Sequence, residues 1–225
     1  MNVILGDSRA SSLNKARLKI KLKEVEDIWG KPGGGYSCCT QLVLDNIIYH
    51  HPPLNNDKCH FYILAGICDL THKISGKGYQ EVIFNDANGS LGQTIKGKIN
   101  HLEQCVLREG AIPVFCTIIP MHLATWNHHR LSHSKTKMLN HLDKYEAMQA
   151  NMEEVLHDLN RFIVETNNSN GMATPTIHTA ITRRRHGKTY TLYKNLPDGC
   201  HPDVATLQKI ATSINKAIVL NQKRH

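Results

Sequence analysis

The chain has 225 residues, of which 40% are hydrophobic and 20% charged, and its formal net charge at pH 7 is +8. This balance excludes an intrinsically disordered chain, and no stretch of sequence approaches the roughly 18 apolar residues of a membrane-spanning helix. The length suits one α/β domain. We therefore expect residues 1–225 to form a single domain without membrane contact, with 221–225 as a flexible tail.

The sequence begins with a short apolar run and lacks the basic segment and longer core of a signal peptide. Its seven cysteines, an odd number, are scattered without a C-x-x-C pair. These features predict an intracellular location, cytoplasmic or nuclear, where the thiols stay reduced. The histidines at 50–51 and 128–133 lack the spacing of metal ligands, so we expect no metal.

The first half of the chain alternates apolar runs with helix-like segments. An apolar run at 2–6, closed by glycine, predicts a buried strand, and Ser11 or Ser12 is the expected cap of the next helix. Residues 18–29 predict a short helix leading into a second strand. The glycines that follow indicate a loop. Two further elements are expected in this half, a helix at 38–50 and a third strand at 59–66.

The second half continues the alternation. Residues 72–88 are irregular and suggest a small hairpin. After them we expect a helix at 91–109 closed by Gly110, a fourth strand at 111–119 stopped by Pro120, a long amphipathic helix at 137–165, a short fifth strand at 175–179 and a final helix opened by Asp203. Strands that alternate with helices predict a parallel sheet wrapped by helices.

Residues with catalytic potential follow the predicted strands. Gly-Asp-Ser at 6–8 follows the first strand, three glycines at 33–35 follow the second, and Gly-Ile-Cys-Asp at 66–69 follows the third. Asp-Gly-Cys-His at 198–201 stands just ahead of the last helix. Because reacting groups collect at the carboxyl ends of parallel strands, we expect these segments at one edge of the sheet.

Their residue types suit nucleophilic catalysis. A serine hydroxyl such as that of Ser8 attacks only when a histidine takes its proton, and His201 is the candidate base. The histidine in turn needs a carboxylate to orient it, which Asp198 offers. Backbone amides at Ser8 and in the glycine loop would then bind the oxyanion.

This set resembles the SGNH (GDSL-like) serine hydrolase superfamily over nearly the whole chain. Gly6, Asp7 and Ser8 match its first block, which carries the nucleophile, and Asp198 and His201 match its last block, D-x-x-H. The resemblance implies a flavodoxin-like three-layer α/β/α fold, for which we expect a five-stranded parallel sheet. It also implies ester hydrolysis without a metal or cofactor.

Two further blocks of the family contribute to its oxyanion hole. The second supplies a glycine amide, for which Gly35 is the preferred match, with Gly33 or Gly34 as alternatives. The third, G-x-N-D, reads Gly-Ile-Cys-Asp at 66–69 of this chain. The sequence therefore departs from the family at one oxyanion donor.

That departure is Cys68, whose thiol is a much weaker donor than the asparagine it replaces. Losing one oxyanion donor lowers turnover by about 10²–10³-fold, so weak activity is expected. Cys68 is also an alternative nucleophile, with His201 as its base. Asp69 is expected to brace the loop beside the hole, with Asp7 and Gly66 in supporting roles.

Two basic clusters could contact nucleic acid, because cations that meet phosphates supply most non-specific affinity. They are Lys15, Arg17, Lys19, Lys21 and Lys23, and the later cluster Arg183, Arg184, Arg185 and Lys188. The stretches at 118–127 and 182–185 also resemble hydrolase-like domains of animal transposable elements. A solubilising surface is the alternative interpretation.

The sequence therefore predicts an esterase that hydrolyses short-chain acyl esters through an acyl-serine intermediate. The alternative is a catalytically degenerate SGNH-fold module that binds nucleic acid or protein, favoured by Cys68 and the basic clusters. A doubly wound nucleotide-binding domain is disfavoured, because no GxGxxG or GxxxxGK[ST] loop follows any predicted strand.

Overall fold

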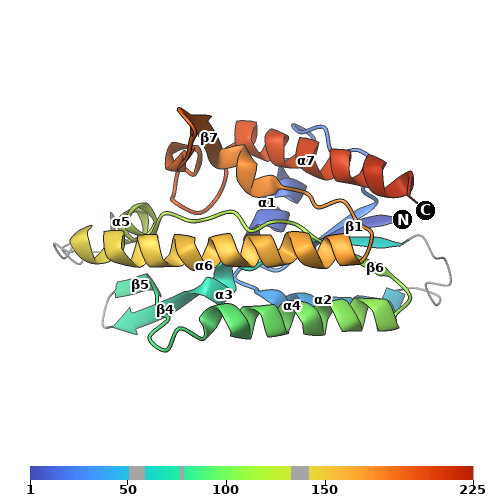
Figure 1. The fold of residues 1–225 in the computed structure, drawn as a ribbon, viewed down its shortest axis with the longest axis horizontal. Coiled ribbons are helices and arrows are strands. Elements are labelled where there is room, and N and C mark those ends of the chain that lie inside the picture. Colours follow the sequence, from blue (N-terminus) through green and yellow to red (C-terminus); the bar gives the residue numbers. More distant parts are fainter. Residues whose placement is uncertain (51–58, 77–78, 133–141, 225) are drawn as a thin grey trace.

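The computed structural model describes residues 1–50, 59–76, 79–132 and 142–224. Within them, four strands form one parallel sheet in the order β2-β1-β3-β6 (Figure 1). The strands are β1 (Asn2–Gly6), β2 (Asp27–Gly30), β3 (His60–Leu64) and β6 (Ile112–Phe115). Every residue of β1 and β3 is buried, as expected for the centre of a sheet that is covered on both faces.

Helices cover both faces of the sheet (Figure 1). On one face α1 (Ser8–Lys15) and α7 (Val204–Gln222) enclose a core that includes Ile4, Leu13 and Ile214. On the other face α2 (Tyr36–His50), α4 (Leu91–Arg108) and α6 (Leu142–Ser169) enclose a second core. No helix in the described part of the chain combines the length and apolar composition needed to cross a bilayer.

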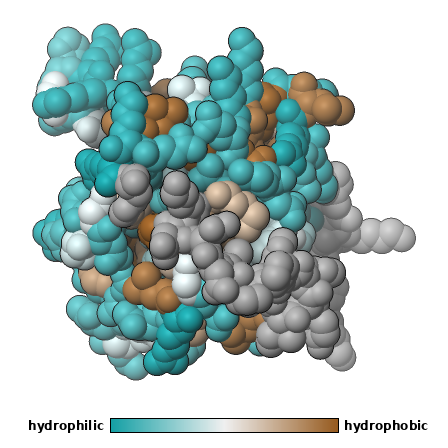
Figure 2. All heavy atoms as spheres, turned by 90° about the vertical axis from the view of Figure 1, so that its right-hand side faces the viewer, coloured by the Kyte–Doolittle hydropathy of each residue, from teal (hydrophilic) through white to brown (hydrophobic). Residues whose placement is uncertain are grey.

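Smaller elements gather at the end of the molecule opposite the two chain termini (Figure 1). They are α3 (Ile67–Leu70), the hairpin of β4 (Thr71–Gly76) and β5 (Tyr79–Phe84), α5 (Leu123–Ser132), the 3-10 turns η1 (Ile177–Ile181) and η2 (Tyr193–Asn195), and the hairpin of β7 (Thr182–Arg185) and β8 (Lys188–Thr191). On the opposite face, which carries the termini, the described residues in view are mainly hydrophilic, with scattered hydrophobic side chains (Figure 2). The carboxyl ends of the strands therefore face the more elaborated end.

The first helix begins earlier than the sequence indicated. The side chain of Asp7 caps it by accepting from Arg9 N at 2.8 Å, so the expected caps, Ser11 and Ser12, lie inside the helix. The short helix expected within 18–29 is also wrong. That segment forms turns and irregular chain before β2, which bury Ile20 and Val25 but leave Leu18 fully exposed.

The fifth strand expected at 175–179 is also wrong, because residues 177–181 form the 3-10 turn η1. The carbonyl of Pro175 accepts from Thr117 N at 3.1 Å and from Ile177 N at 2.9 Å, but Pro175 has no N–H with which to extend a ladder. The tail expected at 221–225 also starts too early, since Asn221 is fully buried within α7. Part of the expected helix at 137–165, residues 137–141, lies outside the described residues.

Two asparagines of α6 occupy part of the place where a fifth strand would pair with β6. Asn167 donates to the carbonyl of Phe115 at 2.7 Å and accepts from its N–H at 3.0 Å. Asn160, two turns earlier, pairs in the same way with the N–H and carbonyl of Ile118. Each side-chain amide mimics a peptide group, so the N–H and carbonyl of Phe115, and those of Ile118 just beyond β6, are satisfied without a neighbouring strand.

We expect Asn167→Ala to lower the free energy of unfolding by about 2–4 kcal/mol, because it leaves the buried N–H and carbonyl of Phe115 without partners. Asn168→Ala is the matched control, since Asn168 is the exposed neighbour on the same helix. Urea unfolding of the two variants measures the difference. Equal midpoints would contradict this account of the β6 edge.

Candidate active site

The two ends of the chain meet in a continuous hydrogen-bond chain of three side chains. Ser8 Oγ lies 2.9 Å from Nε2 of His201, and Nδ1 of the same ring lies 2.6 Å from Oδ2 of Asp198. The second oxygen of Asp198 accepts from the backbone N–H groups of Cys200 at 2.8 Å and His201 at 2.7 Å. Ser8 and the Asp198–His201 pair, which stand far apart in the sequence, are therefore in direct contact.

The electrostatics of Asp198 fix the tautomer of the histidine. Burial alone would raise the pKa of Asp198, but the hydrogen bonds from His201 and from two backbone N–H groups outweigh it and lower the pKa to about 2. The ionised carboxylate can only accept, so the neutral His201 ring carries its proton on Nδ1. Its Nε2 is then free to accept from the hydroxyl of Ser8.

Ser8 is the first residue of α1, directly after the cap Asp7. The N–H of a first helical residue has no acceptor inside the helix, and the helix N-terminus favours negative charge. Both effects suit a nucleophile whose reaction develops an oxyanion nearby. The Asp7 carboxyl is 1% exposed; burial raises its pKa, although the charge of Arg9 offsets part of this effect.

Arg9 is 3% exposed and joins three segments of the site. Its guanidinium donates to the carbonyls of Ile119 at 2.6 Å, Pro120 at 3.1 Å and Cys200 at 3.2 Å. The first two carbonyls belong to the segment between β6 and α5, and the third belongs to the loop of the triad histidine. One buried side chain next to Ser8 therefore ties the histidine loop to the start of α1.

The same loop is held from its other side by the turn into α5. His122 N donates to the carbonyl of Gly199 at 2.7 Å. A Cβ on Gly199 would lie 2.6 Å from Trp126 N, and the residue has a φ of +84°, so glycine is required there. The Trp126 ring in turn lies 5.7 Å from the His201 ring, centroid to centroid. The stretch at 118–127, singled out in the sequence, thus supports the histidine.

The glycine loop after β2 is braced by Asp69, as expected. The Asp69 carboxylate accepts from Tyr36 N, the first residue of α2, at 2.8 Å and from Lys98 Nζ at 2.8 Å. A Cβ on Gly35 would lie only 2.2 Å from this carboxylate, so close packing requires glycine there. Of the three glycines left open by the sequence, Gly33 lines the cleft beside Ser8. The structure therefore favours Gly33 at the cleft and a packing role for Gly35.

Cys68 is the second residue of α3, two positions after Gly66, and lines the cleft with Ser8. Burial raises the pKa of the Cys68 thiol to about 12, so the thiol is neutral near pH 7. The base expected for it, His201, is hydrogen-bonded through Nε2 to Ser8 Oγ, which argues against a neutral Cys68 thiol as the nucleophile. As an oxyanion donor it is weak.

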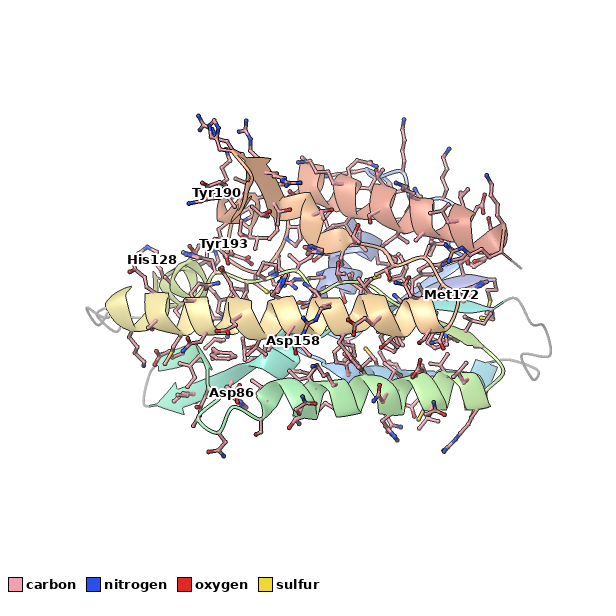
Figure 3. The ribbon with its side chains drawn as sticks, viewed as in Figure 1. Asp86, His128, Asp158, Met172, Tyr190 and Tyr193 are labelled. Atoms are coloured by element: carbon pink, nitrogen blue, oxygen red, sulfur yellow. The ribbon has the colours of Figure 1, made fainter. Side chains whose placement is uncertain are left out.

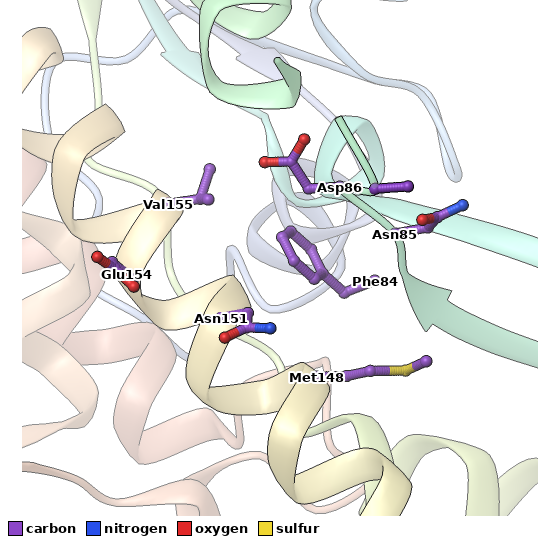
Figure 4. Close-up of a pocket in the computed structure, with 8 residues that line it drawn as sticks. Phe84, Asn85, Asp86, Met148, Asn151, Glu154 and Val155 are labelled. Carbon is purple, nitrogen blue, oxygen red and sulfur yellow. The ribbon is translucent and has the colours of Figure 1, made fainter. Parts of the chain in front are cut away.

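The cleft around the triad has a volume of about 470 Å³. It is lined by Ser8, Ser11, Ser12, Lys15, Pro32, Gly33, Ile67, Cys68, Thr71, Lys73, Val82, Met121, Trp126, Arg130, Cys200 and His201. A second hollow of about 420 Å³ lies between the end of β5 and α6 (Figure 4). Its lining includes Phe84, Asp86 and Glu154 but no residue of the first cleft.

Sequence reasoning missed Arg9, Trp126, Lys73 and Arg130. Arg9 offered one signal, an arginine placed directly between an apolar strand and an apolar helix face. The other three give no local signal, because only the fold brings them to Ser8. The cluster at 183–188 lies on the exposed β7–β8 hairpin and outside the cleft lining.

No three His, Cys, Asp or Glu side chains converge as metal ligands would among the residues that the structure describes. The side chains of histidines 50, 51 and 133 fall outside that part.

Comparisons with solved structures find the same architecture in known hydrolases. A GDSL-like lipase from Bacteroides thetaiotaomicron superposes with a TM-score of 0.65 at 14% identity, over 97% of this chain and 87% of the lipase. An acetyl xylan esterase matches with a TM-score of 0.55 at 12% identity, over 96% of this chain and 99% of the esterase. The OSK domain of Drosophila Oskar also matches, with a TM-score of 0.55, 12% identity, and coverage of 95% and 86%.

No family model and no curated protein matches the chain by sequence. At these identities the structural matches show the fold, which is the α/β fold of the GDSL/SGNH hydrolases with a parallel sheet. The resemblance inferred from the sequence blocks is therefore confirmed at the level of the fold. The sheet has four strands in the described residues, where five were expected.

We expect Arg9→Met to lower the free energy of unfolding by about 2–4 kcal/mol, because three buried carbonyls lose their donor. It should also slow the labelling of Ser8 by a serine-directed phosphonate, since the histidine loop loses its tie. Arg161→Met is the control, because Arg161 is 67% exposed and joins only surface ion pairs, and it should change stability by less than about 0.5 kcal/mol. Wild-type labelling in a folded Arg9→Met protein would count against the positioning role.

Proposed function

We propose that this protein is a serine ester hydrolase that cleaves short-chain acyl esters through an acyl-serine intermediate. The observation that carries the proposal is the hydrogen-bond chain from Ser8 through His201 to an ionised Asp198. A nucleophile, a base in the right tautomer and an orienting carboxylate are the minimum set for this chemistry. The hydrolase fold of the structural neighbours supports it at the level of reaction class.

In the first step Ser8 Oγ attacks the acyl carbon of the ester while His201 Nε2 takes the hydroxyl proton. The resulting imidazolium is stabilised by Asp198, whose carboxylate stays ionised. The tetrahedral oxyanion is stabilised by the N–H of Ser8 and by the glycine loop at Gly33 or Gly35. Collapse of the intermediate breaks the bond to the alcohol oxygen, which leaves with the proton from His201.

In the second step His201 removes a proton from a water molecule, and the hydroxide attacks the acyl-serine. The bond between the acyl carbon and Ser8 Oγ breaks, the serine regains its proton from His201, and the carboxylic acid departs. Side chains of this chain and water carry both steps. Cys68 lowers turnover relative to an asparagine at this position, because its neutral thiol stabilises the oxyanion less than an amide would.

A second candidate function is a degenerate hydrolase-fold module that binds nucleic acid or protein. The observation that favours it is the β7–β8 hairpin, where Arg183, Arg184, Arg185 and Lys188 are exposed. Tyr190 belongs to the same hairpin and is 50% exposed (Figure 3). Exposed arginines beside an aromatic ring suit phosphate contact and base stacking.

We also propose that the protein works in a reducing, intracellular compartment. All seven of its cysteines are free, and five of them are buried. Buried free thiols beside the active site suit an environment that keeps them reduced.

Turnover of short-chain aryl esters should be lost on Ser8→Ala, by at least about 10³-fold in kcat/KM, because the nucleophile is removed. The wild type should also be labelled by a serine-directed phosphonate on Ser8, and mass spectrometry of the labelled peptide measures this. Ser90→Ala, outside the cleft, is the control for loss of a hydroxyl.

A folded wild type that neither turns over ester nor labels would contradict the enzyme proposal. If that protein bound DNA or RNA with a steep salt dependence, and charge removal at Arg183, Arg184 and Arg185 abolished the binding, the second candidate would take its place.

Cys68→Asn should raise kcat about 10–100-fold, because it restores a side-chain donor at the oxyanion. Cys68→Ser is the comparison, since its hydroxyl is a better donor than the thiol but shorter than the amide. Steady-state kinetics on one ester measures the series. A lower kcat for both variants, with unchanged stability, would show that Cys68 is not an impaired substitute for asparagine.

A further inference from the structure

The cleft around Ser8 carries cations on three of its sides. Lys15 belongs to α1, Lys73 to β4 and Arg130 to α5. None of the described residues that line the cleft is an aspartate or a glutamate. Besides the three cations, the titratable groups among the described lining residues are His201 and the thiols of Cys68 and Cys200, and burial raises the pKa of both thiols. The lining is therefore cationic near pH 7, which concentrates anions at the mouth.

The three cations differ in where they stand relative to the reacting atoms. Lys15 is seven residues beyond Ser8 on the same face of α1, which places it about 10 Å from the nucleophile. Lys73 Nζ lies 3.9 Å from the position that a Cβ would take on Gly33, on the oxyanion side of Ser8. Lys15 and Lys73 are both exposed and carry their charges at the rim of the cleft.

Arg130 stands on the side of the histidine. Its guanidinium lies 4.8 Å from the Trp126 ring centroid, and Trp126 lies 5.7 Å from the His201 ring. Because His201 protonates the departing alcohol, the alcohol portion of an ester occupies the side of the cleft that His201 lines. Arg130, held over an aromatic face, therefore borders that portion.

We propose that the substrates of this site are acyl esters whose alcohol portion carries an anionic group, a carboxylate or a phosphate. The inference rests on the proposed esterase function and adds the class of substrate. Arg130 contacts the anionic group of the alcohol portion, and Lys73 and Lys15 attract it to the cleft. The covalent step is unchanged: the acyl group passes to Ser8 and then to water, and the anionic alcohol leaves with a proton from His201.

The test uses esters that differ only in charge. The anionic probe is 4-acetoxy-3-nitrobenzoate, and its neutral partner is the corresponding methyl ester. Each kcat/KM is divided by the rate of hydroxide hydrolysis of the same ester, which removes the difference in leaving-group reactivity. We expect a normalised preference of about tenfold for the anion at low salt, and its decline as ionic strength rises.

Variants locate the preference. Arg130→Gln should lower the normalised ratio about fivefold, Arg130→Lys should recover part of it, and Lys73→Gln should lower it less. Lys216→Gln, which removes an exposed charge from α7 outside the cleft, should leave the ratio unchanged. A ratio near one in the wild type, or an equal fall in all variants, overturns the inference. So does a stronger preference for mono-4-nitrophenyl succinate, which places the anion on the acyl side.

A binding measurement with a non-hydrolysed anion tests this inference independently of the esterase proposal. Phenyl phosphate should quench Trp126 emission saturably in a Trp29→Phe background, with weaker binding at high salt and in Arg130→Gln. If no ester is turned over, the esterase proposal fails and this titration still decides the anion site. Absence of saturable quenching overturns the inference, as does an oligonucleotide that binds the cleft when phenyl phosphate does not.

Discussion

The candidate site depends on one buried cation. Arg9 follows Ser8 directly, and its guanidinium is satisfied by three backbone carbonyls from two distant segments. A guanidinium has several donors in a fixed plane, so it can set the positions of several acceptors at once. Arg9 thus ties the start of α1 to the histidine loop, which the His122–Gly199 hydrogen bond also holds. Ser8 and His201, 193 residues apart in sequence, stay within hydrogen-bond reach for this reason.

The sequence predicted what depends on local pattern. Ser8, after an apolar strand, and the Asp198–His201 pair, before the last helix, could be found because each stands at an element boundary. Arg9 escaped because its acceptors are backbone carbonyls, which every residue has. The expected fifth strand failed because Pro175 and two asparagine side chains compete with β-pairing through contacts that no local periodicity reveals. The role of Arg9 and the failure of the fifth strand thus both depend on tertiary contacts.

The site combines well-ordered acid–base groups with an impaired electrostatic one. Asp198 is satisfied by a ring and two backbone N–H groups, whereas the carboxyl of Asp7 has one oxygen, Oδ2, buried without a hydrogen-bond partner in the described structure. Cys68 adds no charge and only a weak donor. Under the proposed mechanism, proton transfer would therefore have its full set of groups, whereas oxyanion stabilisation would lack one strong donor.

The amides of Asn160 and Asn167 also affect how the molecule behaves in a crowded solution. An exposed strand edge is a template on which other chains can add strands and aggregate. At the outer side of β6, side chains of the protein's own helix already occupy the donors and acceptors of Phe115 and Ile118. Unlike a charged residue placed on an edge, this protection lies inside the core, so changes at the surface leave it intact.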